Sequence, residues 1–213
     1  EELATMGFGE IQFDYIRFPE PYKSLPPQLF KDAKGVSKPR ALAGFLRAAC
    51  PRIHAKGARC TADIFGLVTS NAGALEIGQQ WSELAPVADV LLPMVYPSHY
   101  PKHAYGVAHP NRAPYLIVDS AISASHRQDH KLGITSDFHV RAWLQAFTLG
   151  TPHYGAKEIA EQKRGVYDAG YDSWILWSPG SDYTNYIPAL EKTTVTRRKV
   201  DAAATPAPAA TPK

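Results

Sequence analysis

The stretch GFGEIQFDYIRFP, residues 7–19, carries the strongest fold signal in the chain. Apolar and polar side chains alternate along it with the period of two that is typical of a β-strand, which places Gln12 and Asp14 on one face. Polar side chains on an internal strand are costly unless they line a cavity or find partners. Pro19 and Pro21 end the strand abruptly, and an acid at the carboxyl end of a strand is typical of functional sites in α/β folds.

Strand and helix patterns alternate through the rest of the chain. Five strands are predicted, at residues 10–18, 58–65, 87–96, 139–147 and 173–177. Apolar spacings of three and four residues predict helices over residues 37–55, 73–85, 114–126, 155–169 and 182–192. Residues 139–147 also fit a helix on periodicity alone. The alternation predicts an α/β fold with a parallel sheet and right-handed crossovers.

Length and composition are those of one folded domain followed by a tail. The 213 residues are 45% hydrophobic and 20% charged, which is ordinary for a globular protein with a core. After residue 192 the apolar pattern stops and the chain becomes rich in Pro and Ala. We therefore predict a single domain over residues 1–192 and a disordered tail over residues 193–213.

Charge and motifs exclude several classes of partner and cofactor. The net charge is only +3 and the basic residues are scattered, so no nucleic-acid partner is expected. No segment approaches the roughly 20 apolar residues of a membrane span. Nucleotide-binding glycine motifs are absent, and the loop histidines lack metal-ligand spacing, so we expect neither a cofactor nor a metal. The sequence assigns no oligomeric state.

The two cysteines and the first residues leave questions about processing. Cys50 and Cys60 either form a disulfide or are two buried thiols, and we favour thiols because free cysteines are mostly interior. No signal peptide is visible at Glu1. Residues 1–9 look like the end of a helix that enters the first strand, so we expect the natural N-terminus to lie upstream.

Five blocks of sequence carry a resemblance to a known family. They are FDYIRFP, ADIFG, PMVYPSHY, WLQAF and ILWSPGSDY, which begin at residues 13, 62, 93, 143 and 175. In this order and spacing the chain, over residues 1–192, resembles the glycosyl hydrolase domain family designated domain of unknown function 4015. The resemblance implies the C-terminal part, about five βα units, of an α-amylase-like TIM (β/α)₈ barrel that is truncated at its N-terminus. The alternative is an open five-stranded sheet.

Two carboxylates are the candidate catalytic groups. Glycoside hydrolysis commonly uses one carboxyl group as acid and another as nucleophile or base. Asp14 and Asp63 end neighbouring strands about 4.8 Å apart, which permits the separation of roughly 5 to 5.5 Å found in retaining enzymes. Likeness to the α-amylase arrangement implies that Asp14 is the nucleophile and Asp63 the acid/base. The structural alternatives are an Asp14–Arg17 pair and a loop cap by Asp63.

The predicted substrate-binding residues surround these acids. We expect Arg17 to hold the Asp14 carboxylate and lower its pKa, with Gln12 one step deeper on the same face. Aromatic rings stack on the apolar faces of sugars, and polar tips reach the hydroxyl groups. The residues predicted to contact carbohydrate on this basis are Tyr96, His99, Tyr100, Trp143, Gln145 and Trp177.

These features predict a glycoside hydrolase that acts on an extracellular or cell-envelope polysaccharide by paired-carboxylate chemistry. The alternative is a non-catalytic carbohydrate-binding barrel, which would keep the aromatic residues without a complete acid pair. An open-sheet α/β domain of unrelated function is a third possibility.

Overall fold

The computed structural model describes residues 1–24, 26, 28–29 and 35–191. Five strands form one sheet, in chain order: β1 (Glu10–Phe13), β2 (Arg59–Phe65), β3 (Val90–Val95), β4 (Ala142–Gln145) and β5 (Trp174–Trp177). Each strand is parallel to its neighbour. The α/β prediction is therefore confirmed, and the segment at residues 139–147 contains a strand, not a helix.

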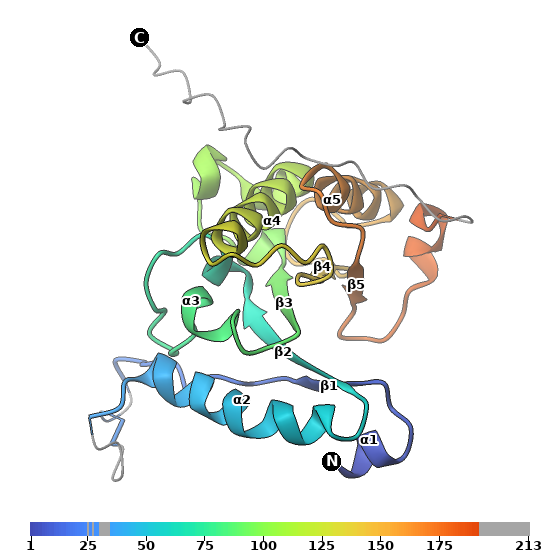
Figure 1. Ribbon diagram of the computed structural model, residues 1–213. Coiled ribbons are helices and arrows are strands. Elements are labelled where there is room, and N and C mark those ends of the chain that lie inside the picture. Colours follow the sequence, from blue (N-terminus) through green and yellow to red (C-terminus); the bar gives the residue numbers. More distant parts are fainter. Residues whose placement is uncertain (25, 27, 30–34, 192–213) are drawn as a thin grey trace.

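Helices connect the strands and cover one face of the sheet (Figure 1). The α-helices are α1 (Glu2–Thr5), α2 (Lys38–His54), α3 (Trp81–Leu84), α4 (Pro114–Lys131) and α5 (Ala156–Asp168). The 3₁₀ helices are η1 (Gly66–Thr69), η2 (Pro97–His99), η3 (Ala104–Gly106), η4 (Pro110–Arg112) and η5 (Thr184–Ala189). Helices α4 and α5 pack side by side, and their close approach needs Gly165, where a Cβ atom would lie 2.9 Å from the Asp119 backbone nitrogen.

The sheet curls, so that side chains from strands that are not neighbours meet on its concave face. Arg141, just before β4, donates hydrogen bonds of 2.7 and 3.1 Å to the two carboxylate oxygens of Glu10 on β1. In a flat sheet three strand spacings, roughly 14 Å, would separate these strands. The five strands with their outer helices therefore form a curled half-barrel, as expected for part of a TIM barrel.

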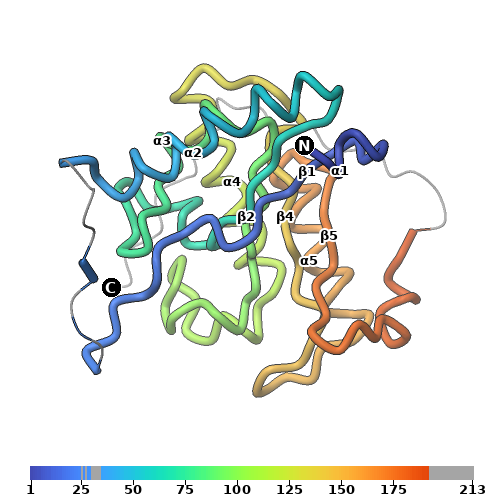
Figure 2. The backbone as a smooth tube through the Cα atoms, turned by 90° about the horizontal axis from the view of Figure 1, so that it is seen from below, coloured from blue at the N-terminus to red at the C-terminus, as the bar shows by residue number. Residues whose placement is uncertain are grey.

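The loops that follow the strands gather at one end of this half-barrel. In Figure 2 the segments after β3 (green) and after β4 (gold) project to the same side, at the bottom of the view. The carboxyl end of a parallel sheet is where α/β barrels place their sites.

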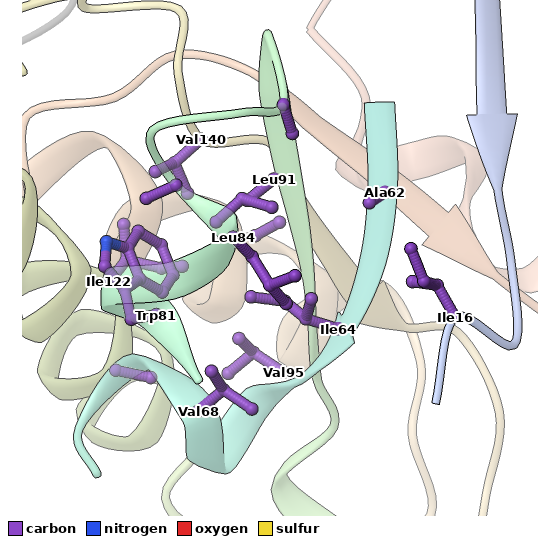
Figure 3. Packing of buried hydrophobic residues seen from close by; sticks show 14 of the residues in the cluster. Ile16, Ala62, Ile64, Val68, Trp81, Leu84, Leu91, Val95, Ile122 and Val140 are labelled. Carbon is purple, nitrogen blue, oxygen red and sulfur yellow. The ribbon is translucent and has the colours of Figure 1, made fainter. Parts of the chain in front are cut away.

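The convex face of the sheet packs against the helices and forms the hydrophobic core (Figure 3). Ala62 and Ile64 of β2 point into this core, together with Leu91 of β3 and Trp81 of α3. The alternate residues Thr61 and Asp63 of β2 point to the concave face, where Val90 and Leu92 of β3 lie in register with them. The main core thus lies outside the sheet, and the concave side combines polar and apolar side chains.

Three predicted segments differ from the structure. Strand β1 ends at Phe13 because the backbone N–H of Tyr15 bonds to the Asp14 carboxylate at 2.7 Å and Tyr15 takes a left-handed φ of 53°. Residues 73–80 are a turn region, not a helix, in which Gly78 has a φ of 89°. The predicted closing helix is only η5, which contains Pro188.

The two cysteines form a disulfide, so the preference for free thiols was wrong. Cys50 on α2 and Cys60 on β2 are both buried, and their Cα atoms lie 5.2 Å apart. Helix α2 packs along β2, which brings the two residues together. Their spacing of ten residues spans the helix-to-strand turn.

The predicted tail, residues 193–213, lies outside the described residues, and the domain boundary at residue 192 stays a prediction. Among the described residues, no helix combines the length and the hydropathy that crossing a membrane requires.

Candidate active site

A cavity of about 210 Å³ lies at the carboxyl end of the half-barrel. Six of the predicted site residues line it: Asp14, Arg17, Asp63, Tyr96, Trp143 and Trp177. They come from every strand or from the loop that follows it, because the carboxyl ends of curled parallel strands converge.

Asp63 is buried on the concave face and held by two neutral donors. Only 5% of the residue is exposed. Gln12 donates to both carboxylate oxygens at 2.9 Å, and the indole N–H of Trp143 donates to Oδ1 at 2.8 Å. Burial raises the pKa of Asp63, the two hydrogen bonds oppose that rise, and the charge of Asp14 adds to it. Asp63 is therefore an oriented carboxyl group that holds its proton more tightly than usual.

Asp14 lies in a different environment at the rim of the same cavity. It is exposed to solvent, and its carboxylate accepts the 2.7 Å bond from the Tyr15 backbone. The turn at Tyr15 fixes this carboxylate directly after the strand. The site therefore has one sheltered and one open carboxyl group.

The predicted pairing of Arg17 with Asp14 was wrong. The Arg17 guanidinium lies 5.4 Å from the ring centroids of both Tyr15 and Phe65, and it donates a long bond of 3.4 Å to the Phe18 carbonyl. Among the ion pairs of the described residues, none joins Arg17 to Asp14. Strand β1 ends at Phe13, and the chain turns at Tyr15, between the two residues.

Aromatic side chains form one wall of the cavity. The rings of Trp143 and Trp177 meet edge to face, with centroids 5.9 Å apart, and Trp177 remains 44% exposed. Tyr96 lies near both acids: burial raises its pKa, and the charges of Asp63 and Asp14 raise it further. The cavity thus offers flat apolar rings beside two carboxyl groups.

Four of the predicted residues do not line this cavity, and two of them, Gln12 and Gln145, hold other groups in place. Gln12 is exposed, and its side-chain amide orients Asp63. Gln145 is fully buried, where its side-chain oxygen accepts from the Ser98 backbone and its nitrogen donates to the Phe147 carbonyl. Both ends of this amide are therefore occupied by loop backbone, and Gln145 positions the segment that carries Ser98.

Four cavity residues were not anticipated from the sequence: Tyr15, Phe65, Gln79 and Met94. Phe65 follows Asp63 by two residues on β2, so the period-two pattern contained the signal for it. Gln79 lies in the segment predicted to be helical. Its side chain bonds to the backbone of Ile16, Asp63 and Phe65 and so ties the ends of two strands together.

His99 and Tyr100 line a second cavity of about 340 Å³, which shares Phe65, Met94 and Tyr96 with the first. Burial lowers the pKa of His99. Its Nδ1 lies 3.0 Å from the Ser98 hydroxyl. Among the described residues, no group of three or more His, Cys, Asp or Glu side chains is arranged to hold a metal ion.

Comparisons with known proteins agree with this fold. No curated protein is similar in sequence. The crystal structure of the Bacillus megaterium QM B1551 spore cortex-lytic enzyme SleL is similar in fold, with a TM-score of 0.55 and 13% identity. The alignment covers 92% of this chain and 52% of that one, so the chain spans about half of the SleL structure. The model of a family described as "putative glycosyl hydrolase domain" matches residues 1–183. The resemblance found in the five sequence blocks is confirmed, and the chain belongs to this glycosyl hydrolase domain family.

Proposed function

We propose that this chain is the catalytic half-barrel of a glycoside hydrolase that cleaves a polysaccharide with Asp14 and Asp63. The observation that carries the proposal is that both carboxyl groups line one cavity, in contrasting environments. A pair of carboxyl groups with different surroundings is what acid/base cleavage of a glycosidic bond requires.

The contrast between the two environments supports a separate role for each acid. Burial keeps the proton on Asp63 to higher pH, which suits the acid that protonates the leaving oxygen. Asp14 is open to solvent and to a ligand in the cavity, which suits the nucleophile or base. Trp143 holds Asp63 through its N–H and presents its ring to the cavity, so one side chain serves both the acid and the sugar.

We propose an extracellular or cell-envelope location. The disulfide between Cys50 and Cys60 supports an oxidising compartment, where such bonds persist. The SleL structure, similar in fold, is that of a spore cortex-lytic enzyme.

The test is release of reducing sugar from a panel of polysaccharides by the 213-residue chain and by Asp14→Asn and Asp63→Asn variants. Each variant is expected to lose about 10²- to 10⁴-fold in rate, because each removes a group that moves charge or a proton in the transition state. Asp172→Asn is the control, since Asp172 is exposed and lies at the other end of β5. Turnover retained by both active-site variants would contradict the mechanism.

A non-catalytic carbohydrate-binding role is the second candidate. The exposed ring of Trp177 beside Trp143 supports it, because such a surface binds sugar without any acid. The two roles separate in the same experiment. A binding module retains polysaccharide and releases no reducing sugar, whether or not Asp63 is replaced.

A further inference from the structure

The second cavity is a continuation of the first along the carboxyl end of the sheet. Phe65, Met94 and Tyr96 form the wall between the two cavities and line both. Its other side is formed by the side chains of Leu67 and His99. With about 340 Å³ beside the 210 Å³ of the acid cavity, it has room for a ligand group next to one held at Asp14 and Asp63.

The lining of this second cavity carries no fixed charge. All of its lining residues are described, and none of them is Asp, Glu, Lys or Arg. His99 is the only titratable group with a pKa near neutrality, and burial lowers that pKa, which favours the neutral imidazole. A charged substituent placed here would find no oppositely charged side chain in the lining.

One polar tip remains available in an otherwise apolar wall. His99 is exposed and has Nδ1 within 3.0 Å of the Ser98 hydroxyl, which leaves Nε2 for a hydrogen bond to a ligand hydroxyl. The Tyr100 hydroxyl is fully buried, so Tyr100 offers its ring and not its hydroxyl to the cavity.

We propose that this cavity is a subsite for an uncharged sugar unit that adjoins the unit held at the two acids. Apolar rings match the C–H faces of a neutral pyranose, and Nε2 of His99 matches one of its hydroxyl groups. The inference rests on the proposed function for the identity of the ligand as a saccharide. It adds that the substrate has at least two units and that the unit in this subsite is neutral.

The test is calorimetric binding of hexasaccharides to the 213-residue chain. The neutral probes are maltohexaose, laminarihexaose, cellohexaose and chitohexaose. The charged counterparts are the three glucans oxidised to uronates at C6, and the chitosan hexamer. We expect the neutral member of at least one pair to bind tenfold or more tightly than its charged counterpart.

Leu67→Lys is the decisive variant, because Leu67 lines the subsite and is 37% exposed, so a charged end fits without disturbing the core. It is expected to improve binding of the uronate about tenfold relative to the neutral glucan. Leu116→Lys on α4, where Leu116 is 48% exposed and lines neither cavity, is the matched control and should leave the ratio unchanged.

The outcomes distinguish failure of the subsite from failure of the hydrolase proposal. Equal affinity for neutral and charged probes, or an unchanged ratio in Leu67→Lys, overturns the subsite. Selective binding without cleavage leaves the subsite standing and overturns the hydrolase proposal. Cleavage without selectivity between neutral and charged probes supports the hydrolase proposal and overturns the subsite. Binding of none of the eight probes overturns both proposals.

Discussion

The indole N–H of Trp143 on β4 donates a 2.8 Å hydrogen bond to Asp63 on β2, although β3 separates the two strands. The bond is possible only because the sheet curls, and it holds one oxygen of the carboxyl group from across the concave face. Gln12 on β1 holds the same group from the other side at 2.9 Å. Hydrogen bonds from β1 and from β4 thus orient the Asp63 carboxyl group on β2, and both donors are uncharged.

Replacing Trp143 with Phe should raise the pKa of Asp63. The indole hydrogen bond lowers that pKa against the effect of burial, and a phenyl ring removes the bond while it keeps an apolar ring in place. The measurement is the pH titration of the Asp63 carboxyl carbon by NMR. Trp177→Phe is the control, since Trp177 lines the cavity without bonding to Asp63, and a shift of the same size there would count against the explanation.

The stability of the chain should depend on pH through Asp63. Burial raises its pKa above the ordinary value of 3.8, so between that value and the raised pKa the folded state binds the proton more tightly than the unfolded state. The contribution of Asp63 to stability is therefore present at low pH and lost as pH rises through the folded pKa. Urea unfolding should show that wild type loses stability relative to Asp63→Asn between pH 4 and pH 7. Wild type gaining stability relative to Asp63→Asn over this range would refute the explanation.

The ion pair between Arg141 and Glu10 should stabilise the curl. Arg141→Met is expected to lower the free energy of unfolding by about 1 to 2 kcal/mol, because the Glu10 carboxylate loses two hydrogen bonds and keeps its ion pair with Arg59. The double variant Glu10→Gln/Arg141→Met should recover part of that loss. The exposed pair Arg47–Glu83 is the control, and Arg47→Met should cost less than about 1 kcal/mol. Equal losses of unfolding free energy in Arg141→Met and Arg47→Met would mean that the Arg141–Glu10 pair stabilises the fold no more than an exposed ion pair does.

The disulfide should contribute about 2 to 3 kcal/mol to stability, the value expected for a closed loop of ten residues. Denaturant unfolding of Cys50→Ala/Cys60→Ala measures it against wild type. A reducing agent should lower the midpoint of the wild-type chain and leave that of the double variant where it is. Equal sensitivity of both proteins would show that the reductant acts elsewhere.

Trp177→Ala should weaken binding of a polysaccharide ligand by about three- to tenfold, the roughly 0.5–1.5 kcal/mol typical of one aromatic contact. Trp177 is 44% exposed, so its loss should change the free energy of unfolding little. Affinity electrophoresis measures the binding and urea unfolding measures the stability. Lost stability with unchanged binding would make Trp177 a packing residue.

Much of the site follows from local pattern. Alternation on residues 10–18 placed Gln12 on the concave face, and the end of β2 placed Asp63 at the same edge of the sheet. The predicted Asp14–Arg17 contact failed because of a single turn. The left-handed Tyr15 ends β1 early, and it turned Arg17 toward two aromatic rings instead of toward Asp14. Such a turn depends on a side-chain bond to the backbone, which periodicity does not report.

The sequence by itself determined the alternation of strands and helices, because burial imposes a period of two on one and about 3.6 on the other. It also determined that the strand within GFGEIQFDYIRFP is followed by an acid, Asp14, at the edge of the sheet. Only the tertiary structure decided which distant residues meet. The Cys50–Cys60 bond, the Glu10–Arg141 pair and the shared cavity of Asp14 and Asp63 all depend on helix packing and on the curl of the sheet. Those arise from contacts far apart in the chain, which no local pattern encodes.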